Sequence, residues 1–449
     1  MIKKTALLSL VLSACASSQS SSLAHPSAPM ASTPSTPAPK SPPKSAVKPE
    51  APIAPPTPPT QTAQIDHVID QRTQQQRFAD WQQDFIRRAR AKGYDADMLA
   101  RTVGQAKIDP KALDKDVKQP EFTKPIWSYV DGVNSAKRIQ GGKDKLAQHA
   151  QLFEDLENRY HVDKYILTSI WGLESSYGTI LGDHKIIDSL ATFAFEGRRV
   201  SFGENQLFAV LDMLKRGDVR QDQLIGSWAG AVGMTQFIPT TFRDYAVDYD
   251  GNGNKDLWTN PGDALGSAAN YLARHGWRYA EPVFAEVILP DGFDYSLTSN
   301  TKRTVSGWTG MGIRPVGGQN WSKAALFLEA KVLAPAGAKG PAFLTFKNFD
   351  VIKKYNNSTS YALGITVLAR LFADQPTIIR DWPRDDQPLS RSERQELQRA
   401  LTRQGFDTQG VDGLIGPNSR RAIRGWQLRH GLPADGYVEH SLYEKIIAQ

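Results

Sequence analysis

The 449-residue chain contains a single cysteine, Cys15, so it cannot form an internal disulfide bond. It has no His-Glu-x-x-His motif for zinc and no glycine-rich loop of the kind that binds phosphate groups. No basic run with interleaved aromatic residues is present, and the net charge of +7 suits an anionic polymer or surface as well as an ordinary soluble protein. These absences give no support to a metalloprotease, a nucleotide-dependent enzyme or a nucleic-acid-binding protein.

The N-terminus has the order of charged and apolar residues that is typical of an export signal. Met1-Ile2-Lys3-Lys4 is positive, and residues 6–12 are apolar but too few to span a membrane. The following Leu12-Ser13-Ala14-Cys15 resembles the lipobox of bacterial lipoproteins, in which cleavage leaves the cysteine as a lipidated N-terminus. We therefore expect residues 1–14 to be a signal peptide and Cys15 to carry the lipid; a plain signal peptide or a core cysteine is the alternative. Ala16 in place of aspartate implies, by the same resemblance, the periplasmic face of the outer membrane of a Gram-negative bacterium.

Residues 15–70 are expected to form a tether. From Ala16 to about Thr62 the chain consists mainly of serine, proline, alanine and threonine with scattered lysine. Such a segment cannot bury a hydrophobic core, and its prolines favour an extended, semi-rigid backbone. A tether of this kind suits an anchored protein that must reach a neighbouring layer.

Residues 71–380 have the pattern of one mainly helical domain. Apolar residues at helical spacing predict helices in several segments, which lie at residues 78–86, 95–99, 163–178, 206–217, 263–275 and 357–372. Residues 283–289 and 342–346 are instead rich in β-branched and aromatic residues and predict strands, with glycines and prolines between them. The fold class is therefore α+β and mainly helical, with a small β-containing lobe inserted into the helical part.

The predicted helix at 163–178 carries an inward carboxylate. Asp163 is a residue type that caps helix N-termini, and Gly178 is expected to end the helix. Glu174 lies on the apolar stripe formed by Ile166, Ile170, Leu173 and Tyr177. Burial and the negative end of the helix dipole both raise the pKa of a carboxyl group, and a carboxylic acid kept protonated is what general acid catalysis of glycoside cleavage requires. The alternative is that Glu174 pairs with an arginine or lies at the edge of the stripe.

The sequence Glu174-Ser175-Ser176-Tyr177-Gly178 at the end of an apolar helix resembles the catalytic motif of the lytic murein transglycosylase B family, and the resemblance extends over roughly residues 74–380. Three further segments carry it, at residues 227–239, 268–272 and 355–362. The resemblance implies a lysozyme-like catalytic domain with Glu174 as the catalytic residue. It also implies that Ser227 orients Glu174 and that Gln236 holds an acetamido group. Loop packing is the alternative role for both.

The same resemblance implies further contacts to the substrate. Tyr271, Asn356 and Tyr361 match residues that line the family's cleft. Arg198 and Arg199 match a pair that meets the peptide carboxylates of the glycan, with a solvated charge pair as the alternative.

An acidic loop lies between the first and the second of the three segments, after residue 239 and before residue 268. Asp248, Asp250, Asn252 and Asn254 place oxygen atoms at positions 1, 3, 5 and 7 of a loop similar to an EF-hand, but position 12 lacks the usual glutamate. Asp263 matches the acidic ligand of the family's own variant of this loop. We expect structural calcium or sodium here and no cofactor in catalysis; an Asx-rich turn without an ion is the alternative.

The C-terminal segment, residues 389–449, forms a separate unit in this interpretation. Residues 375–388 contain three prolines and several charges, which indicates a linker. The stretches at residues 411–420 and 422–436 closely resemble the common peptidoglycan-binding domain, a small three-helix bundle. Its expected core residues are Leu401, Ile423, Trp426 and Leu442.

Together these resemblances imply an anchored lytic transglycosylase of cell-wall turnover and remodelling. Glu174 would protonate the oxygen between N-acetylmuramic acid (MurNAc) and N-acetylglucosamine (GlcNAc), then take the proton of the muramoyl 6-hydroxyl as it closes on C1 to give a 1,6-anhydro end. The expected partners are glycan strands, the outer membrane and proteins of wall synthesis or division, without nucleic acid. Two alternatives stay open: a hydrolase with a second carboxylate such as Asp188 or Glu196, and a non-enzymatic lipoprotein that ties the membrane to the wall.

Overall fold

The computed structural model describes residues 72–116, 125–197, 199–298 and 300–449. The expected signal peptide, the lipidated Cys15, the tether at 15–70 and Arg198 lie outside the described residues. Among the helices described, none is both long and apolar enough to cross a membrane.

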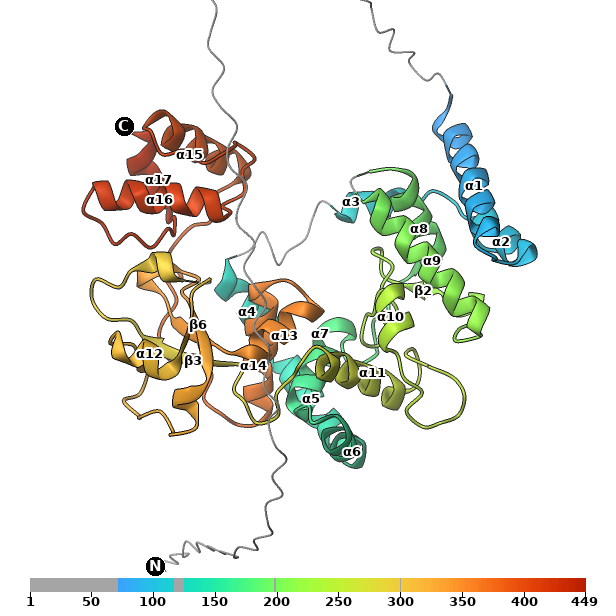
Figure 1. Ribbon diagram of the computed structural model, residues 1–449, viewed down its shortest axis with the longest axis horizontal. Helices are drawn as coiled ribbons and strands as arrows, with labels where there is room; N and C mark the ends of the chain where they lie inside the picture. Colours follow the sequence, from blue (N-terminus) through green and yellow to red (C-terminus); the bar gives the residue numbers. More distant parts are fainter. Residues whose placement is uncertain (1–71, 117–124, 198, 299) are drawn as a thin grey trace, which may run out of the picture. The chain divides into compact units, whose positions relative to one another are not determined.

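Helices dominate the part of the chain before the β-containing lobe, and the mainly helical α+β class is confirmed (Figure 1). The helices on either side of the lobe are α1 (Gln74–Ala91), α2 (Ala96–Arg101), α3 (Pro110–Asp116), α4 (Ile126–Val133), α5 (Ala136–Gln148), α6 (Ala150–Tyr160), α7 (Lys164–Ser175), α8 (Ile186–Phe195), α9 (Val200–Arg216), α10 (Pro239–Tyr245), α11 (Pro261–Arg274), α13 (Lys347–Tyr355) and α14 (Thr359–Phe372). All six predicted helices are present. The sequence pattern did not reveal α3, α4, α5, α6, α8, α10 and α13.

Side-chain caps explain where the central helices begin. The Asp163 carboxylate accepts hydrogen bonds from the backbone N–H groups of Tyr165 (2.7 Å) and Ile166 (3.2 Å), so α7 starts where the sequence predicts. Ser358 caps α14 in the same way. A cap of this kind contributes about 1 kcal/mol to helix stability, because it satisfies backbone donors that have no partner in the first turn.

The lobe between α11 and α13 is a five-stranded antiparallel sheet of order β4-β6-β7-β3-β5. Its strands are β3 (Phe284–Ile288), β4 (Lys302–Thr304), β5 (Arg314–Pro315), β6 (Glu329–Leu333) and β7 (Ala342–Thr345). The predicted strands correspond to β3 and β7, which pair with Val287 opposite Ala342. The lobe has its own core around Trp308 of helix α12 (Val305–Gly310), whose indole N–H donates to the Ala330 carbonyl (2.9 Å).

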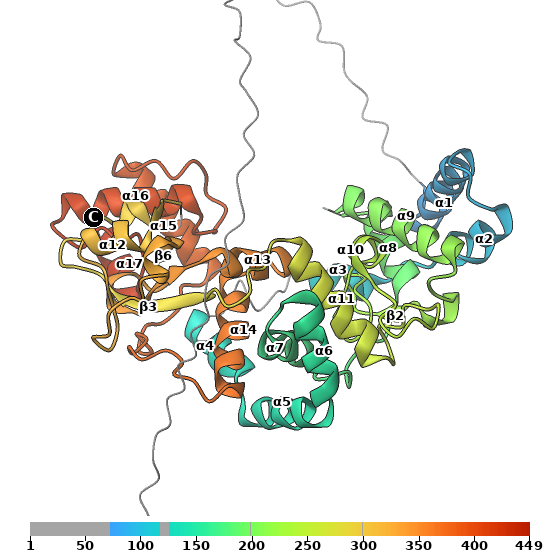
Figure 2. The same cartoon turned by 60° about the horizontal axis from the view of Figure 1, so that its bottom comes forward.

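The helix that carries Glu174, α7, is at the centre of the main core. α7 packs against α5, α6 and α14, and Figure 2 shows it between α6 and α14. Leu167, Ile170 and Trp171 are fully buried in these contacts. Each such side chain contributes roughly 1.5–3 kcal/mol when it leaves water, so the helix that carries Glu174 is firmly held on several sides.

α8 and α9 form a closely packed pair (Figure 1) because Gly203 on α9 has no side chain. A Cβ atom at Gly203 would lie 2.3 Å from the backbone nitrogen of Ala194 on α8. α10 is joined to this pair by a reciprocal contact: the Gln206 amide donates to the Thr240 hydroxyl (3.1 Å) and accepts from the Thr240 backbone N–H (2.9 Å).

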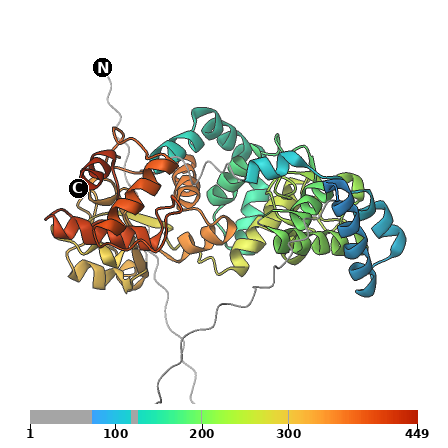
Figure 3. The same ribbon diagram turned by 90° about the horizontal axis from the view of Figure 1, so that it is seen from above.

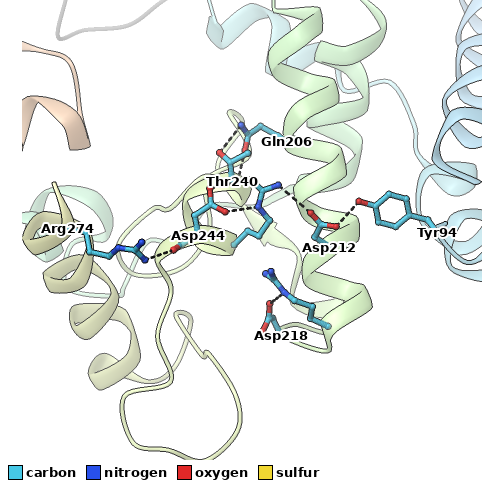
Figure 4. Close-up of polar contacts among 9 residues, drawn as sticks. Tyr94, Gln206, Asp212, Asp218, Thr240, Asp244 and Arg274 are labelled. Atoms are coloured by element: carbon cyan, nitrogen blue, oxygen red, sulfur yellow. Dashed lines mark hydrogen bonds and ion pairs between the residues drawn. The ribbon is translucent and has the colours of Figure 1, made fainter. Parts of the chain in front are cut away.

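Figure 4 shows the contact between Gln206 and Thr240 beside a series of ion pairs and hydrogen bonds. Arg243 on α10 bonds to Asp212 (3.3 Å) on α9, and Asp212 accepts the hydroxyl of Tyr94 (2.6 Å). Because α10 begins directly after the loop at residues 227–238, these contacts hold that loop in place.

The C-terminal helices form their own bundle, red in Figure 3. It consists of α15 (Arg391–Arg403), α16 (Pro417–Arg429) and α17 (His440–Ile447). The expected core residues Leu401, Ile423, Trp426 and Leu442 are all buried in it. The segment before α17 contacts the lobe: the Asp435 carboxylate accepts from the Ala338 backbone N–H (2.8 Å), and Lys339 pairs with Glu439 (2.6 Å).

Candidate active site

Glu174 lies in the last turn of α7 and is half-buried. Its Oε1 atom accepts a hydrogen bond from the hydroxyl of Tyr361 (2.6 Å), which is buried in the first turn of α14. Burial, followed by the negative charge of Glu174, raises the pKa of Tyr361 well above its usual value. Tyr361 is therefore a protonated donor at neutral pH and orients the carboxyl group of Glu174.

The turn after α7 differs from the prediction, which ended the helix at Gly178. The helix ends at Ser175, and Ser176, Tyr177 and Gly178 follow with φ angles of 49°, 60° and 82°. The left-handed conformation costs a residue other than glycine about 1–2 kcal/mol, so tertiary contacts must maintain it. The Tyr177 hydroxyl donates to the Arg138 carbonyl (2.5 Å), and the Ser175 hydroxyl donates to the Met234 carbonyl (2.6 Å). Tyr177 is consequently not part of the helical stripe on which the sequence placed it.

Ser227 and Gln236 lie in the loop that follows strand β2 (Ile225–Gly226), which pairs with β1 (His184–Lys185). The Ser227 hydroxyl accepts the backbone N–H of Ala231 (3.1 Å). Gln236 has a φ of 48°, and its amide donates to the carbonyls of Gly233 (2.9 Å) and Leu181 (3.2 Å). Both side chains are thus fixed by backbone groups, and their assigned roles toward Glu174 and an acetamido group stay predictions.

An aromatic cluster joins this loop to α11 and α13. The rings of Tyr271 and Tyr355 are 5.3 Å apart, and each lies 5.9 Å from Phe237. The Tyr271 hydroxyl donates to the Lys354 carbonyl (2.6 Å), and the Tyr355 hydroxyl donates to the Thr235 carbonyl. Burial raises the pKa of Tyr271 to about 12. Tyr271 and Tyr355 are therefore uncharged at neutral pH, and their hydrogen bonds to backbone carbonyls hold both rings in place.

Tyr355 is a residue of this region that sequence reasoning did not select. Burial and then the charge of Glu174 raise the pKa of Tyr355 well above the usual value. It stands immediately before Asn356, which caps the C-terminus of α13 and is half-buried. The sequence did offer one signal for Tyr355: it is an aromatic residue at the start of the segment 355–362, directly before Asn356, which was predicted to contact the substrate.

Arg199 lies on the α8–α9 side of the molecule. Its guanidinium group is 4.1 Å from the ring centre of Phe202 and 5.7 Å from that of Phe193. The Phe193 ring in turn packs edge-on against Trp228 at 6.2 Å, in the loop of Ser227. The structure thus brings Arg199 to the neighbourhood of this loop through its contact with Phe193, which packs edge-on against Trp228.

The two carboxylates considered for a hydrolase are engaged elsewhere. Asp188 accepts the backbone N–H of Lys107 (3.1 Å) and lines a cavity with residues of α2 and β2. Glu196 accepts the side-chain amide of Gln74 (2.8 Å). Asp188 and Glu196 lie near the two ends of α8, and their hydrogen bonds connect this helix to the segments of Lys107 and Gln74. Both carboxylates therefore have a structural role.

The acidic loop brings three of its predicted ligands together. Oxygen atoms of Asp248, Asp250 and Asp263 lie within 4.8 Å of one another. Asp263 is fully buried on α11, and its two oxygens accept the backbone N–H groups of Tyr249 (2.7 Å) and Asp256 (2.8 Å). Burial, and then the charges of Asp250 and Asp248, raise the pKa of Asp263. A cation would relieve this repulsion, and an all-oxygen donor set suits calcium or sodium, so the residues fit the ion.

Asn252 and Asn254 belong to the same turn. The Asn252 side-chain oxygen accepts the backbone N–H of Asn254 (2.9 Å). The Asp248 carboxylate accepts the backbone N–H groups of Gly251 (2.8 Å) and Gly253 (2.7 Å). The loop therefore has the internal bonds of an Asx-rich turn as well as converging carboxylates.

Comparison with known proteins agrees with these features. Residues 77–370 match the Transglycosylase SLT domain family, and residues 390–446 match the peptidoglycan binding domain family. The membrane-bound lytic murein transglycosylase B of Escherichia coli (strain K12) is 31% identical over 300 residues, which is 63% of this chain and 79% of that protein. SltB3 from Pseudomonas aeruginosa, solved in complex with NAG-anhNAM-pentapeptide, is 46% identical with a TM-score of 0.78, over 82% of this chain and 99% of that chain.

A third relative bears on the acidic loop. The Escherichia coli lytic transglycosylase Slt35, solved in complex with calcium, is 29% identical with a TM-score of 0.58, over 65% of this chain and 92% of that chain. The first family match alone covers more than half of the present sequence. The chain therefore belongs to the Transglycosylase SLT domain family and is a lytic transglycosylase with a C-terminal peptidoglycan-binding domain.

Proposed function

We propose that this protein cleaves the β-1,4 bond between MurNAc and GlcNAc in peptidoglycan and leaves 1,6-anhydro-MurNAc ends, in turnover and remodelling of the cell wall. The observation that carries the proposal is the bond of 2.6 Å between Glu174 and Tyr361, which fixes one carboxyl group at the end of a buried helix. The ligand of the relative SltB3 contains anhNAM, a sugar of the kind that this reaction forms.

Glu174 performs both proton transfers in this mechanism. As the acid, it protonates the oxygen that leaves with GlcNAc while positive charge develops at C1 of the muramoyl sugar. As the base, it then accepts the proton of the muramoyl 6-hydroxyl, whose oxygen bonds to C1. One carboxyl group suffices because the sugar supplies its own nucleophile, whereas hydrolysis requires a second carboxylate to activate water or to attack.

The products distinguish this mechanism from hydrolysis. We expect digestion of purified sacculi to give muropeptides that lack the mass of one water, resist borohydride reduction and gain no label from H₂¹⁸O. Reducible products that contain ¹⁸O would show a muramidase and contradict the proposal.

Tyr361→Phe should lower kcat on soluble glycan by roughly 10- to 100-fold, because a hydrogen bond to a charged group is worth roughly 1.5–3 kcal/mol. The ring and its packing stay, so KM and the melting temperature should change little. Tyr443→Phe is the matched control, since it removes a similar bond to Glu396 (2.7 Å) in the C-terminal bundle. Equal activity of the Tyr361→Phe variant and the wild type would show that Tyr361 does not orient the carboxyl group of Glu174.

The proposed location is the periplasmic face of the outer membrane, with Cys15 lipidated and residues 15–70 as the tether. The support is the lipobox-like sequence and the membrane-bound character of the Escherichia coli relative. Cys15→Ala should move the protein from the membrane fraction to the soluble fraction, because the lipid attachment point is gone. Fractionation followed by a salt wash measures this, and a variant that still pellets with membranes would contradict the anchor.

The proposed division of labour gives catalysis to residues 71–380 and wall binding to residues 389–449. The separate core of the C-terminal bundle and its family match support it. Within this proposal the substrate partner is the glycan strand, and proteins of wall synthesis or division are the further partners.

Calcium is the proposed structural ion of the acidic loop, held by Asp248, Asp250, Asn252, the carbonyl of Asn254, and Asp263. An ion that binds only the folded state stabilises it by about 2.7 kcal/mol at one hundred times its dissociation constant. Millimolar calcium should therefore raise the melting temperature, and a chelator should lower it without changing the anhydro product.

Asp248→Ala should abolish the response to calcium, whereas the exposed Asp291→Ala should keep it. Differential scanning fluorimetry across chelator and calcium measures both. Identical melting curves of the wild type in the two conditions would leave the loop as an Asx-rich turn.

A further inference from the structure

A cavity of about 620 Å³ is lined by residues of α2, β1, α8 and β2 and belongs to none of the functions assigned above. Its basic lining comes from two separate segments: Arg101 and Lys107 flank the short helix η1 (Val103–Gln105), and Lys185 is in strand β1. All three side chains are exposed. In the part of the chain that the structure describes, no carboxylate forms an ion pair with any of them.

The charges around this cavity do not balance. Asp222 is committed to Arg220, which it binds through both oxygens at 3.1 Å. This leaves Asp188, half-buried and bonded to the backbone N–H of Lys107, as the carboxylate facing three cations. Burial raises the pKa of Asp188, and the nearby lysines oppose this. An excess of cations over carboxylates around a concave surface favours an anionic ligand.

The backbone that presents these cations is held rigidly. The Gln221 side-chain amide donates to the Arg101 carbonyl (2.7 Å), and the Ile186 backbone N–H donates to the Leu224 carbonyl (3.0 Å). Strand pairing places Lys185 opposite Ile225. Because the backbone of the cavity is already fixed by these hydrogen bonds, a ligand loses less conformational entropy when it binds. A modest number of charge contacts is then sufficient for a measurable affinity.

The cavity is connected to the active-site loop by short stretches of chain. Ile225 lines the cavity and precedes Ser227 by two residues, so their Cα atoms are at most about 7 Å apart. Lys185 follows Leu181 by four residues, at most about 14 Å, and the Leu181 carbonyl accepts the amide of Gln236. A ligand that starts in the cleft at Ser227 and Gln236 therefore reaches the cavity within a few residues of extended chain.

We infer that this cavity binds the carboxylates of the peptide stem carried by the glycan strand. The inference rests on the proposed function, which places a muramoyl sugar, the attachment point of the stem, in the cleft. A five-residue peptide in extended conformation spans about 17 Å, which exceeds the chain-length bounds from Ser227 to Ile225 and from Leu181 to Lys185 at the edge of the cavity. These residues are distinct from Arg198 and Arg199.

The test uses the full-length enzyme with Arg101→Gln, Lys107→Gln and Lys185→Gln combined. Two soluble substrates are compared: uncrosslinked glycan strands with their peptide stems, and the same strands after an amidase has removed the stems. We expect kcat/KM on stem-bearing strands to fall about tenfold through a rise in KM, because three charge contacts to the stem carboxylates are lost. On the stripped strands kcat/KM should equal that of the wild type.

Two controls keep the result specific. Arg77→Gln, Lys137→Gln and Lys323→Gln together remove the same charge from other exposed positions and should leave both substrates unaffected. Lys185→Glu alone, at an exposed position, should reproduce the selective rise in KM if the triple variant proves unstable.

An equal loss on both substrates, or no loss on either, would overturn the inference. So would selective loss of binding to phosphatidylglycerol vesicles with both substrates unaffected, because the ligand would then be a lipid phosphate. Failure of the proposed function is a separate outcome, visible as reducible products from the wild-type enzyme.

Discussion

Glu174→Gln is expected to abolish lysis of sacculi while the protein still folds and still binds the wall. The amide has the shape of the carboxyl group and can stay beside Tyr361, but it can neither deliver a proton to the glycosidic oxygen nor accept one from the 6-hydroxyl. Loss of general acid–base catalysis typically costs on the order of 100- to 10,000-fold, and the cost is larger when one residue makes both transfers. Release of anhydro-muropeptides per minute, quantified by mass spectrometry, measures it.

Glu154→Gln is the matched control for this substitution, because it makes the same chemical change on the exposed side of α6. It should retain wild-type turnover. Melting temperature and sacculus pelleting should agree among the wild type and both variants. Near-normal turnover of Glu174→Gln would show that another group transfers the proton and would end the single-carboxyl mechanism.

Gly182→Ala should cause the largest loss of stability among single changes near the active site. Gly182 has a φ of +97°, and a Cβ atom there would lie 2.1 Å from the backbone oxygen of Gly226. The contact is with backbone, so β1 and β2 must separate to relieve it. We expect the free energy of unfolding to fall by about 2–4 kcal/mol. Activity should fall as well, because the adjacent Leu181 carbonyl holds Gln236.

Two causes contribute to the loss of stability in Gly182→Ala, the positive φ of the backbone and the collision of the new Cβ atom with Gly226, and Gly217→Ala tests the first of them alone. Gly217 also has a positive φ, +74°, but no atom lies within 4 Å of the position of its Cβ. This variant should lose only the backbone contribution, about 1–2 kcal/mol, and keep full activity. Urea unfolding followed by tryptophan fluorescence gives both values. Equal destabilisation by the two substitutions would mean that β1 and β2 do not approach as closely as the structure shows.

Local sequence determined the beginnings of the central helices. Asp163, Asp95 and Ser358 accept backbone N–H groups two or three residues away, so the caps depend only on their immediate neighbours. The helical spacing of apolar residues likewise identified α1, α7 and α14.

The sequence pattern did not predict the short strands β4 and β5. β3 and β7 have buried residues on several successive positions and were predicted, whereas β4 has three exposed residues and β5 has only two residues in all. A strand without a buried face shows no alternation of apolar and polar residues, so only its pairing partners in the sheet reveal it.

The candidate active site likewise has some features set by local sequence and others set by the tertiary structure. Sequence determined that Glu174 lies near the end of a buried helix, and the motif selected Tyr361, although not Tyr355. Tertiary structure alone decided that α7 ends at Ser175, because the left-handed turn after it depends on the distant carbonyls of Arg138 and Met234. The bond between Glu174 and Tyr361 likewise joins residues that are 187 positions apart. Caps and periodicity depend on neighbours within one helical turn, whereas the orientation of a carboxyl group depends on whichever segments the completed core brings against it.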